Sequence, residues 1–392
     1  MTTDHTTEEK IPFWLDPGKR AIMFQILTFL MVGLLAFYLV NNTLTNLEKQ
    51  NISTGFDFID KEASFEIGES PIEYSAADSY AKALLVGFLN TLKVSFLGIA
   101  LCTVIGIFVG VARLSSNWLV SKLALWYIEV MQNIPVLLQL FFWYALFYEI
   151  FPSPRQALNP MDGLFLCNRG MAFGVPAAHP AHKYIILALI AGLAISFLIN
   201  KWAKKRLFET GKFFPVFWTS LGVIIGLPLL TWLLGGAPTE MNVPSLQGFN
   251  FKGGALLSPE FVALLLGLTI YTSAFVAEAV RAGIQSVTKG QTEAAHSIGL
   301  KSRHVLSLVI LPQAMRVIIP PLTSQMLNLT KNSSLAIAIG FPDFVSVANT
   351  TINQTGQSIE GVAMIMGCYL IFSLSTSLFM NWYNKRSQLM ER

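Results

Sequence analysis

The sequence has few charged residues, few cysteines and none of several common catalytic motifs. Only 13% of its 392 residues are charged and 53% are hydrophobic, whereas about 25% of the residues of a soluble domain are charged. The motifs H-E-x-x-H, G-x-S-x-G and G-x-x-x-x-G-K-[ST] are all absent. Their absence argues against a zinc protease and an α/β-hydrolase, and it excludes a P-loop ATPase within this chain.

Cysteine and histidine are too sparse to predict a disulfide framework or a metal centre. The three cysteines, Cys102, Cys167 and Cys368, show no pairing pattern. His179 and His182 lie near Cys167 in the sequence, but the spacing fits no known four-ligand pattern and a fourth ligand is missing. We therefore expect this chain itself to bind no metal and no cofactor.

Long hydrophobic runs are what the sequence does have. A helix needs about 20 apolar residues to cross a bilayer core roughly 30 Å thick. Because lipid offers the backbone no hydrogen-bond partner, such spans must be helical. The runs predict an all-α membrane protein with about eight transmembrane helices, at residues 21–40, 84–112, 134–151, 184–200, 214–234, 260–281, 313–340 and 361–383.

The distribution of basic residues predicts the orientation of these spans. With the N-terminus inside, the cytoplasmic segments hold 18 of the 27 Lys and Arg residues and the external segments hold 7. The strongest single anchor is the basic run 201–206. Both termini are therefore expected in the cytoplasm. The external segments 41–83 and 152–183 are rich in turn-forming residues and could be partly ordered caps.

One cytoplasmic connector, residues 290–312, has the pattern of a helix, a glycine stop and a second helix. Gly299 suits the left-handed position that ends a helix, Ser302 suits an N-cap, and Pro312 allows a bend at the start of the next span. A face of small and apolar residues could approach the groove of a partner: Ala294, Ala295 and Ile298. These patterns alone leave open a second reading, an ordinary amphipathic connector.

The same connector resembles the "EAA" loop of ABC importer permeases. The matching positions are Glu293, Ala294, Ala295, Gly299, Leu311 and Pro312. Segments 90–95, 127–139, 271–284 and 331–335 resemble polar amino-acid permeases, and the extra spans are similar to the larger subunit of general L-amino-acid permeases. One position departs from that pattern, because Gln132 stands where those proteins usually have Arg.

The resemblance implies a type I (MetI-like) permease core of five helices with three further helices. Its parts would be residues 1–83 with an extra helix, 84–151 as the first core part, 152–259 as an insertion with two extra helices, and 260–392 as the second core part. It also implies partners in the bacterial inner membrane: a dimer of ATP-binding subunits holding ATP and Mg, a second related permease subunit and a periplasmic amino-acid-binding protein. No nucleic-acid partner is expected.

Polar residues inside the spans are the candidates for a translocation path, because ionisable groups in lipid are costly unless they face a cavity or a partner. Interhelical hydrogen bonding would explain several of them equally well. Glu278 and Arg281 lie three residues apart, so they can pair on one helix face as a clamp near a gate. The candidates for the path are Asn90, Thr91, Ser95, Gln139, Thr272, Lys331, Asn332 and Ser333.

The resulting prediction is a transport protein and not an enzyme. The permease would import polar or general L-amino acids by ATP-driven alternating access, with ATP hydrolysed by a separate subunit. An ion-coupled secondary amino-acid transporter is the alternative, but Glu129 and Glu278 lie near the cytoplasmic ends of their spans and not at the midplane. A structural scaffold without transport is a third possibility, and the polar residues within the spans argue against it.

Overall fold

A computed structural model of the chain describes residue 14, residues 16–49 and residues 55–387. Among these, seven helices are long and apolar enough to cross a membrane, and the number rises to eight if one sharply bent helix pair counts as a single span. This agrees with the prediction of about eight transmembrane helices. The described residues divide into two compact units, each with a hydrophobic core of its own.

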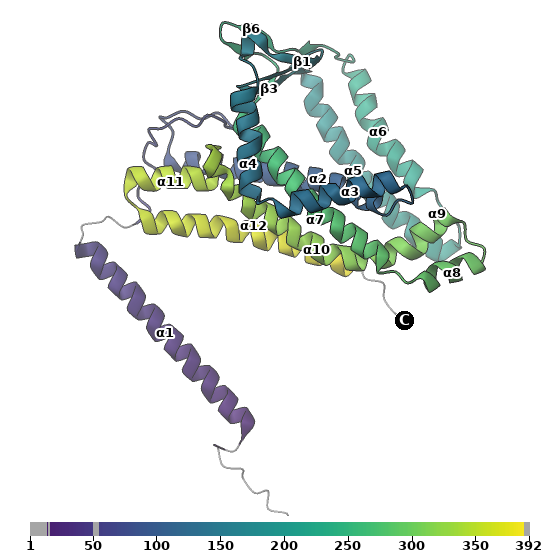
Figure 1. Cartoon of the computed structure of the whole chain (residues 1–392), viewed down its shortest axis with the longest axis horizontal. Helices are drawn as coiled ribbons and strands as arrows, with labels where there is room; N and C mark the ends of the chain where they lie inside the picture. The colour runs from purple at the N-terminus through teal and green to yellow at the C-terminus, as the bar shows by residue number, and fades with distance from the viewer. Residues whose placement is uncertain (1–13, 15, 50–54, 388–392) are drawn as a thin grey trace, which may run out of the picture. The chain divides into compact units, whose positions relative to one another are not determined.

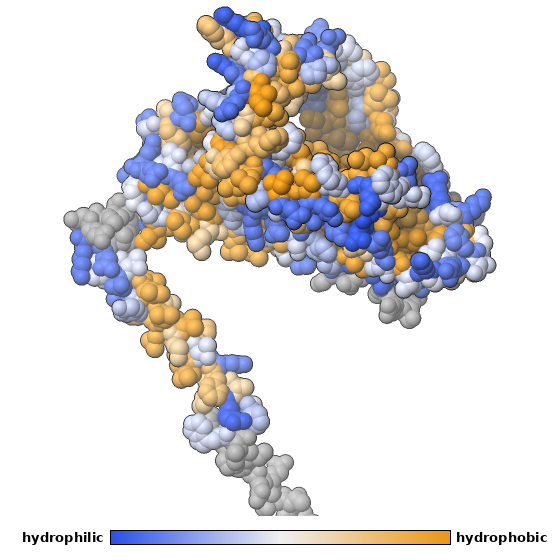
Figure 2. Space-filling view, in the orientation of Figure 1, coloured by the Kyte–Doolittle hydropathy of each residue, from blue (hydrophilic) through white to orange (hydrophobic). Residues whose placement is uncertain are grey.

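Unit 1 contains the described residues up to Lys93 together with Pro342–Phe379. Hydrophobic side chains cover most of α1 (Figure 2), as expected for a helix surrounded by lipid. The segment between α1 and α2 contributes Phe58 and Ala63 to a core shared with α2, α11 and α12. The helices of this unit are α1 (Pro17–Lys49), the first part of α2 (Tyr80–Arg113), α11 (Phe344–Thr355) and most of α12 (Ser358–Ser387).

Unit 2 contains Val94–Phe341 and the described residues after Phe379 (Figure 1). Its core joins α2, α4, α7, α10 and the turns that follow α4 and α10. Its helices, after the second part of α2, are α3 (Trp118–Asn133), α4 (Val136–Ala145), η1 (Leu146–Ile150), η2 (Pro154–Gln156), α5 (Pro180–Thr210), α6 (Val216–Leu234), α7 (Pro259–Gln285), α8 (Lys289–Ser297), α9 (Ser302–His304), η3 (Val305–Ile310), α10 (Leu311–Asn332) and η4 (Ser333–Ile339).

The third predicted span differs from the structure. Residues 134–151 were expected to form one helix after a cytoplasmic connector, but α3 occupies most of that connector and α3 and α4 meet at an angle of 101°. Pro135 causes the break, because its ring disfavours helical backbone in the preceding residue. Ile134 accordingly has extended backbone, with φ −92° and ψ 124°.

The insertion contains short strands that the all-α prediction leaves out, although the chain as a whole is predominantly helical. One antiparallel sheet has the order β1-β2-β3-β8, and two further strand pairs are β4–β5 and β6–β7. The partly ordered cap expected at 152–183 is thus a small sheet. The strands are β1 (Leu158–Met161), β2 (Leu164–Cys167), β3 (Gly170–Phe173), β4 (Val175–Pro176), β5 (Met241–Asn242), β6 (Ser245–Gln247), β7 (Asn250–Lys252) and β8 (Ala255–Leu257).

Glycines allow α2 to lie close to α7 in unit 2. A Cβ atom added at Gly106 would lie 2.5 Å from Cβ of Val276, and one added at Gly110 would lie 2.6 Å from the carbonyl oxygen of Ala277. Both distances are too short for any side chain. Helices in lipid gain little from hydrophobic burial, so close packing of small residues is a main source of their association.

The first prediction concerns this contact. Gly106→Ala adds a methyl group that Val276 must move to accommodate, and we expect a loss of about 1–3 kcal/mol in stability, seen as a lower melting temperature of the purified protein. Gly222→Ala in α6 is the matched control, because a Cβ atom there meets nothing within 4 Å. Equal melting temperatures for the two variants would contradict the importance of the contact.

Candidate functional site

Connector 290–312 begins with helix α8, which ends in a Schellman motif. Gly299 has φ +81°, the left-handed conformation that was predicted for it. The Gly299 N–H donates to the carbonyl oxygen of His296 at 2.9 Å, and the Leu300 N–H donates to that of Ala295 at 3.2 Å. These two bonds satisfy carbonyl groups at the helix end and fix the direction in which the chain leaves α8.

The second part of the connector differs in one detail from the prediction. Ser302 is the first residue of α9 and not its N-cap, which is Lys301 without a side-chain capping bond. Backbone N–H groups of His304 and Val305 donate to the Lys301 carbonyl oxygen instead. The chain then runs through the π-helix η3 into α10, and Pro312, which has no N–H donor, coincides with this change from π- to α-helix.

The predicted partner face of the connector is only partly exposed. Ala295 is buried where α8 packs near η3, whereas Ala294 is exposed and Ile298 is 78% exposed. Ile298 and Ala294 together leave a small apolar surface at the end of α8 that another protein could contact. A shallow depression lies between α8 and the start of α10, lined by Gln291, Leu308, Val309, Pro312, Gln313 and Arg316.

Glu278 and Arg281 form the ion pair that their spacing predicted. Arg281 Nε donates to Glu278 Oε2 at 2.9 Å, and the guanidinium also bonds to the second carboxylate oxygen and to the Gln285 side chain. The pair lies near the C-terminal end of α7, shortly before the connector. The pairing is confirmed, and its role at a gate stays a prediction.

Two path candidates, Asn90 and Thr91, lie in unit 1 and hold the backbone before α11. The Asn90 amide donates to the carbonyl oxygens of Glu69, at 2.8 Å, and Pro342, at 2.9 Å. Thr91 Oγ1 accepts a hydrogen bond from the Phe344 N–H at 3.0 Å. Both side chains are fully buried. These contacts give them a structural task at the start of α11.

Gln139, Ser95 and Thr272 lie in unit 2 and are all buried. The Gln139 amide donates to the carbonyl oxygens of Met131 and Ile134, at 3.0 and 3.1 Å, and so bridges the break between α3 and α4. The Ser95 hydroxyl and the Gln139 carbonyl oxygen have no hydrogen-bond partner among the described residues. The Asn90 side-chain oxygen in unit 1 is likewise unpaired. Unpaired buried polar atoms are costly, so these atoms are the indication of a polar path.

Lys331, Asn332 and Ser333 lie where α10 changes into the 3₁₀-helix η4. Lys331 lies within the apolar helical run Ser302–Ile339, as expected, in the last turn of α10 and with an exposed side chain. Ser333 is buried and donates to the Thr330 carbonyl oxygen at 2.7 Å. Transitions of this kind within one helical run often mark a functional hinge.

Several contacts in the structure were not predicted from the sequence. The Tyr127 hydroxyl lies 2.7 Å from Ser273 Oγ and joins α3 to α7. Gln132 donates to the Ala274 carbonyl oxygen at 3.3 Å and also joins these helices. Asp343 is fully buried as the N-cap of α11, and burial raises its pKa to about 7. An Asp directly before a helical pattern was a usable signal for the cap.

Two features of the described residues have a plain structural explanation. His179 Nδ1 accepts a hydrogen bond from the Ala181 N–H and caps α5, while Cys167 is buried in strand β2.

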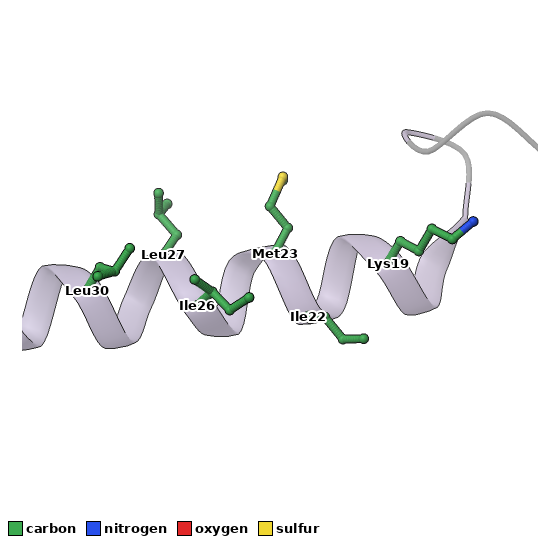
Figure 3. Close-up of a pocket in the computed structure, with 6 residues that line it drawn as sticks. All are labelled: Lys19, Ile22, Met23, Ile26, Leu27 and Leu30. Atoms are coloured by element: carbon green, nitrogen blue, oxygen red, sulfur yellow. The ribbon is translucent and has the colours of Figure 1, made fainter.

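An apolar depression on α1 is formed by side chains of that one helix (Figure 3), so it is part of a lipid-facing surface. The lining residues are Lys19, Ile22, Met23, Ile26, Leu27 and Leu30.

Comparison with known proteins identifies the family. Residues 184–388 match the model of the binding-protein-dependent transport system inner membrane component. The chain belongs to this family. Membership makes it a transport component of the membrane and disfavours the ion-coupled alternative.

The similarity to individual permeases extends over nearly the whole chain. The chain is 47% identical to the general L-amino acid transport system permease protein AapQ of Rhizobium johnstonii, over 96% of this chain and 94% of that protein. It is 49% identical to the putative amino-acid ABC transporter permease protein YhdX of Escherichia coli, over 96% of both chains. A third relative is the glutamate/glutamine/aspartate/asparagine permease protein BztB of Rhodobacter capsulatus, 38% identical over 96% of both.

The second prediction concerns the ion pair of this permease. Arg281→Met leaves the Glu278 carboxylate without its partner, whereas Glu278→Gln/Arg281→Met removes both charges. We expect the single variant to melt at a lower temperature than the double variant. The coupling energy should be about 0.5–1 kcal/mol, because the Glu278 side chain is 42% exposed. Additive losses in a double-mutant cycle would contradict a direct pair.

Proposed function

We propose that this permease is the membrane-spanning subunit of an ABC importer that moves polar or general L-amino acids into the cell. The observation that carries the proposal is its similarity, over almost its full length, to three permeases named for amino-acid transport. The substrate class is therefore inferred from those relatives, and the side chains of this chain do not define it.

The connector 290–312 supports docking of a separate ATPase. It has a fixed turn at Gly299, two exposed apolar residues in Ala294 and Ile298, and a shallow depression beside α8. The chain has no phosphate-binding loop of its own. We therefore propose that ATP and Mg are held by two ATP-binding subunits, and that Glu293, Leu311 and Pro312 belong to the surface that meets one of them.

Movement of the ATPase would reach the spans through a continuous helical run that begins within the connector. Residues Ser302–Ile339 form one such run, bounded by the turn at Gly299 and the left-handed Gly340. A push on α8 is thereby transmitted to α10 and to the transition at Ser333. ATP can drive transport only if it binds the outward and inward states with different affinities, and this run is the element that would change between them.

The remaining partners and the topology complete the proposal. A periplasmic binding protein would deliver the substrate, and a second, related permease subunit would form the other half of the pathway. Both termini would lie in the cytoplasm of a bacterium with an inner membrane, as the excess of basic residues in those segments favours. The polar path would pass near Ser95, Gln139, Thr272 and the segment from Lys331 to Ser333.

The third prediction tests docking. Gly299→Val places a β-branched residue at φ +81°, which costs about 1–2 kcal/mol or more and distorts the turn. We expect co-purification of the ATPase and ATP-dependent amino-acid uptake to fall together, roughly tenfold. Gly290→Val in α8 is the control, because it also meets open space and its φ is not positive. Survival of both activities in Gly299→Val would exclude the docking role.

The fourth prediction tests the path. Lys331→Met removes the positive charge at the end of α10 and leaves the transition to η4 in place. We expect uptake to be lost while all subunits still co-purify, and Lys331→Arg to restore part of it. Normal uptake by the Met variant would show that Lys331 has no part in transport, even if the permease itself is correctly assigned.

A further inference from the structure

Helices α5 and α6 form an antiparallel hairpin with a defined register (Figure 1). Near one end, a Cβ atom on Gly235 would lie 2.6 Å from Cβ of Ala181, and further along Gly192 packs on the backbone of Ile224. The register places Val216, the first residue of α6, level with Asn200 of α5. Residues 201–210 of α5 therefore project roughly 15 Å beyond the start of α6.

The projecting end coincides with the end of the hydrophobic run. The apolar part of α5 ends at Asn200, and α6 is apolar from Val216 onward. Both helices thus leave the hydrocarbon at the same level. We call residues 201–218 the hairpin tip. Beyond that level the chain returns through residues 211–215, and Phe214 packs edge-on against Trp202 with ring centroids 5.2 Å apart.

The tip is strongly basic. It contains five basic residues and a single acidic residue, Glu209, which lies 3.7 Å from Lys205. Arg206 is stacked over the Trp202 ring, 5.1 Å from its centroid, so its guanidinium is oriented beside the indole. A positive charge of this density immediately outside a span attracts anionic lipid headgroups.

The tip also exposes large aromatic side chains. Phe208 is 89% exposed and Phe213 is 83% exposed, while Phe217 and Trp218 are 68% and 72% exposed. Water alone would be a poor environment for so many rings, whereas the boundary between headgroups and acyl chains suits both the rings and the nearby cations.

The rings at the tip are largely uncovered, since Phe208 and Phe213 are each more than four-fifths exposed. The extensive packing of α5 and α6 is that of one helix on the other. A basic, aromatic and uncovered surface at the membrane boundary could receive either lipid or protein. The alternation of cations and rings on one short segment favours lipid, because a headgroup takes the charge while its acyl chain takes the rings.

We propose that the hairpin tip is a binding site for an anionic phospholipid, held by Lys201, Lys205 and Arg206 at its phosphate and by Phe217 and Trp218, on the hydrocarbon side of these cations, at its acyl chains. The site belongs to the insertion and does not depend on the transported substrate. It would anchor the α5–α6 hairpin in the lipid around the transporter.

The fifth prediction is tested with the full-length permease, purified with its partner subunits and placed in nanodiscs. The discs contain phosphatidylcholine and phosphatidylglycerol in a fixed ratio, with bromine near the headgroup end of the acyl chains of one lipid or the other. The Trp202 signal is the difference in fluorescence between the protein and its Trp202→Phe variant. We expect phosphatidylglycerol to quench this signal several times more strongly, and the preference to fall as salt is raised.

Three variants make the test specific. Lys201→Gln/Lys205→Gln/Arg206→Gln should remove most of this several-fold preference and bring quenching by the two lipids close to equal, whereas Lys201→Arg/Lys205→Arg should keep it. Lys49→Gln/Lys61→Gln/Lys252→Gln removes three charges elsewhere and should also keep it. Equal quenching of the unsubstituted protein by the two lipids would overturn the proposal. A lipid preference that survives in the first variant would also overturn it. Loss of a partner subunit from the first variant with the lipid preference intact would identify a protein interface instead.

Discussion

Inside a bilayer a backbone N–H or C=O group has no water to bond, so it must find its partner within the protein. Continuous helices meet this requirement by themselves. At two interruptions of the helices of this permease, buried side chains complete the bonding: Gln139 at the break between α3 and α4, and Asn90 and Thr91 at the entry to α11. The interruptions and the polar residues that serve them are therefore one feature of the structure.

This requirement changes the interpretation of the polar residues in the spans. A sequence shows that a residue is polar and lies in a hydrophobic run, but not whether it faces a cavity or a neighbouring carbonyl group. Asn90 and Gln139 could be selected from the sequence, yet their bonds join residues up to 252 positions apart. A buried atom without a hydrogen-bond partner, such as Ser95 Oγ, can be recognised only when the partners of the other buried polar atoms are known.

Features set by local chemistry were predictable from the sequence. The spans follow from composition, the left-handed turn at Gly299 from its place after a helical segment, and the Glu278–Arg281 pair from spacing on one helix. Features set by packing were not. The bend at Pro135 was missed because α3, with 16 residues, is too short to be predicted as a span. The strands of the insertion were missed because they are only two to four residues long. The helical start at Ser302 differed by one residue, since backbone bonds to Lys301 replace a side-chain cap.

The turn that ends α8 has a consequence for how such transporters diversify. Its shape is held by two backbone hydrogen bonds and by one glycine, so it makes no demand on the exposed side chains around it. Ala294 and Ile298 can therefore be exchanged without altering the direction of the chain. The exposed residues of this surface can change in evolution, or be redesigned to accept a different ATPase, while the turn at the end of α8 keeps its geometry.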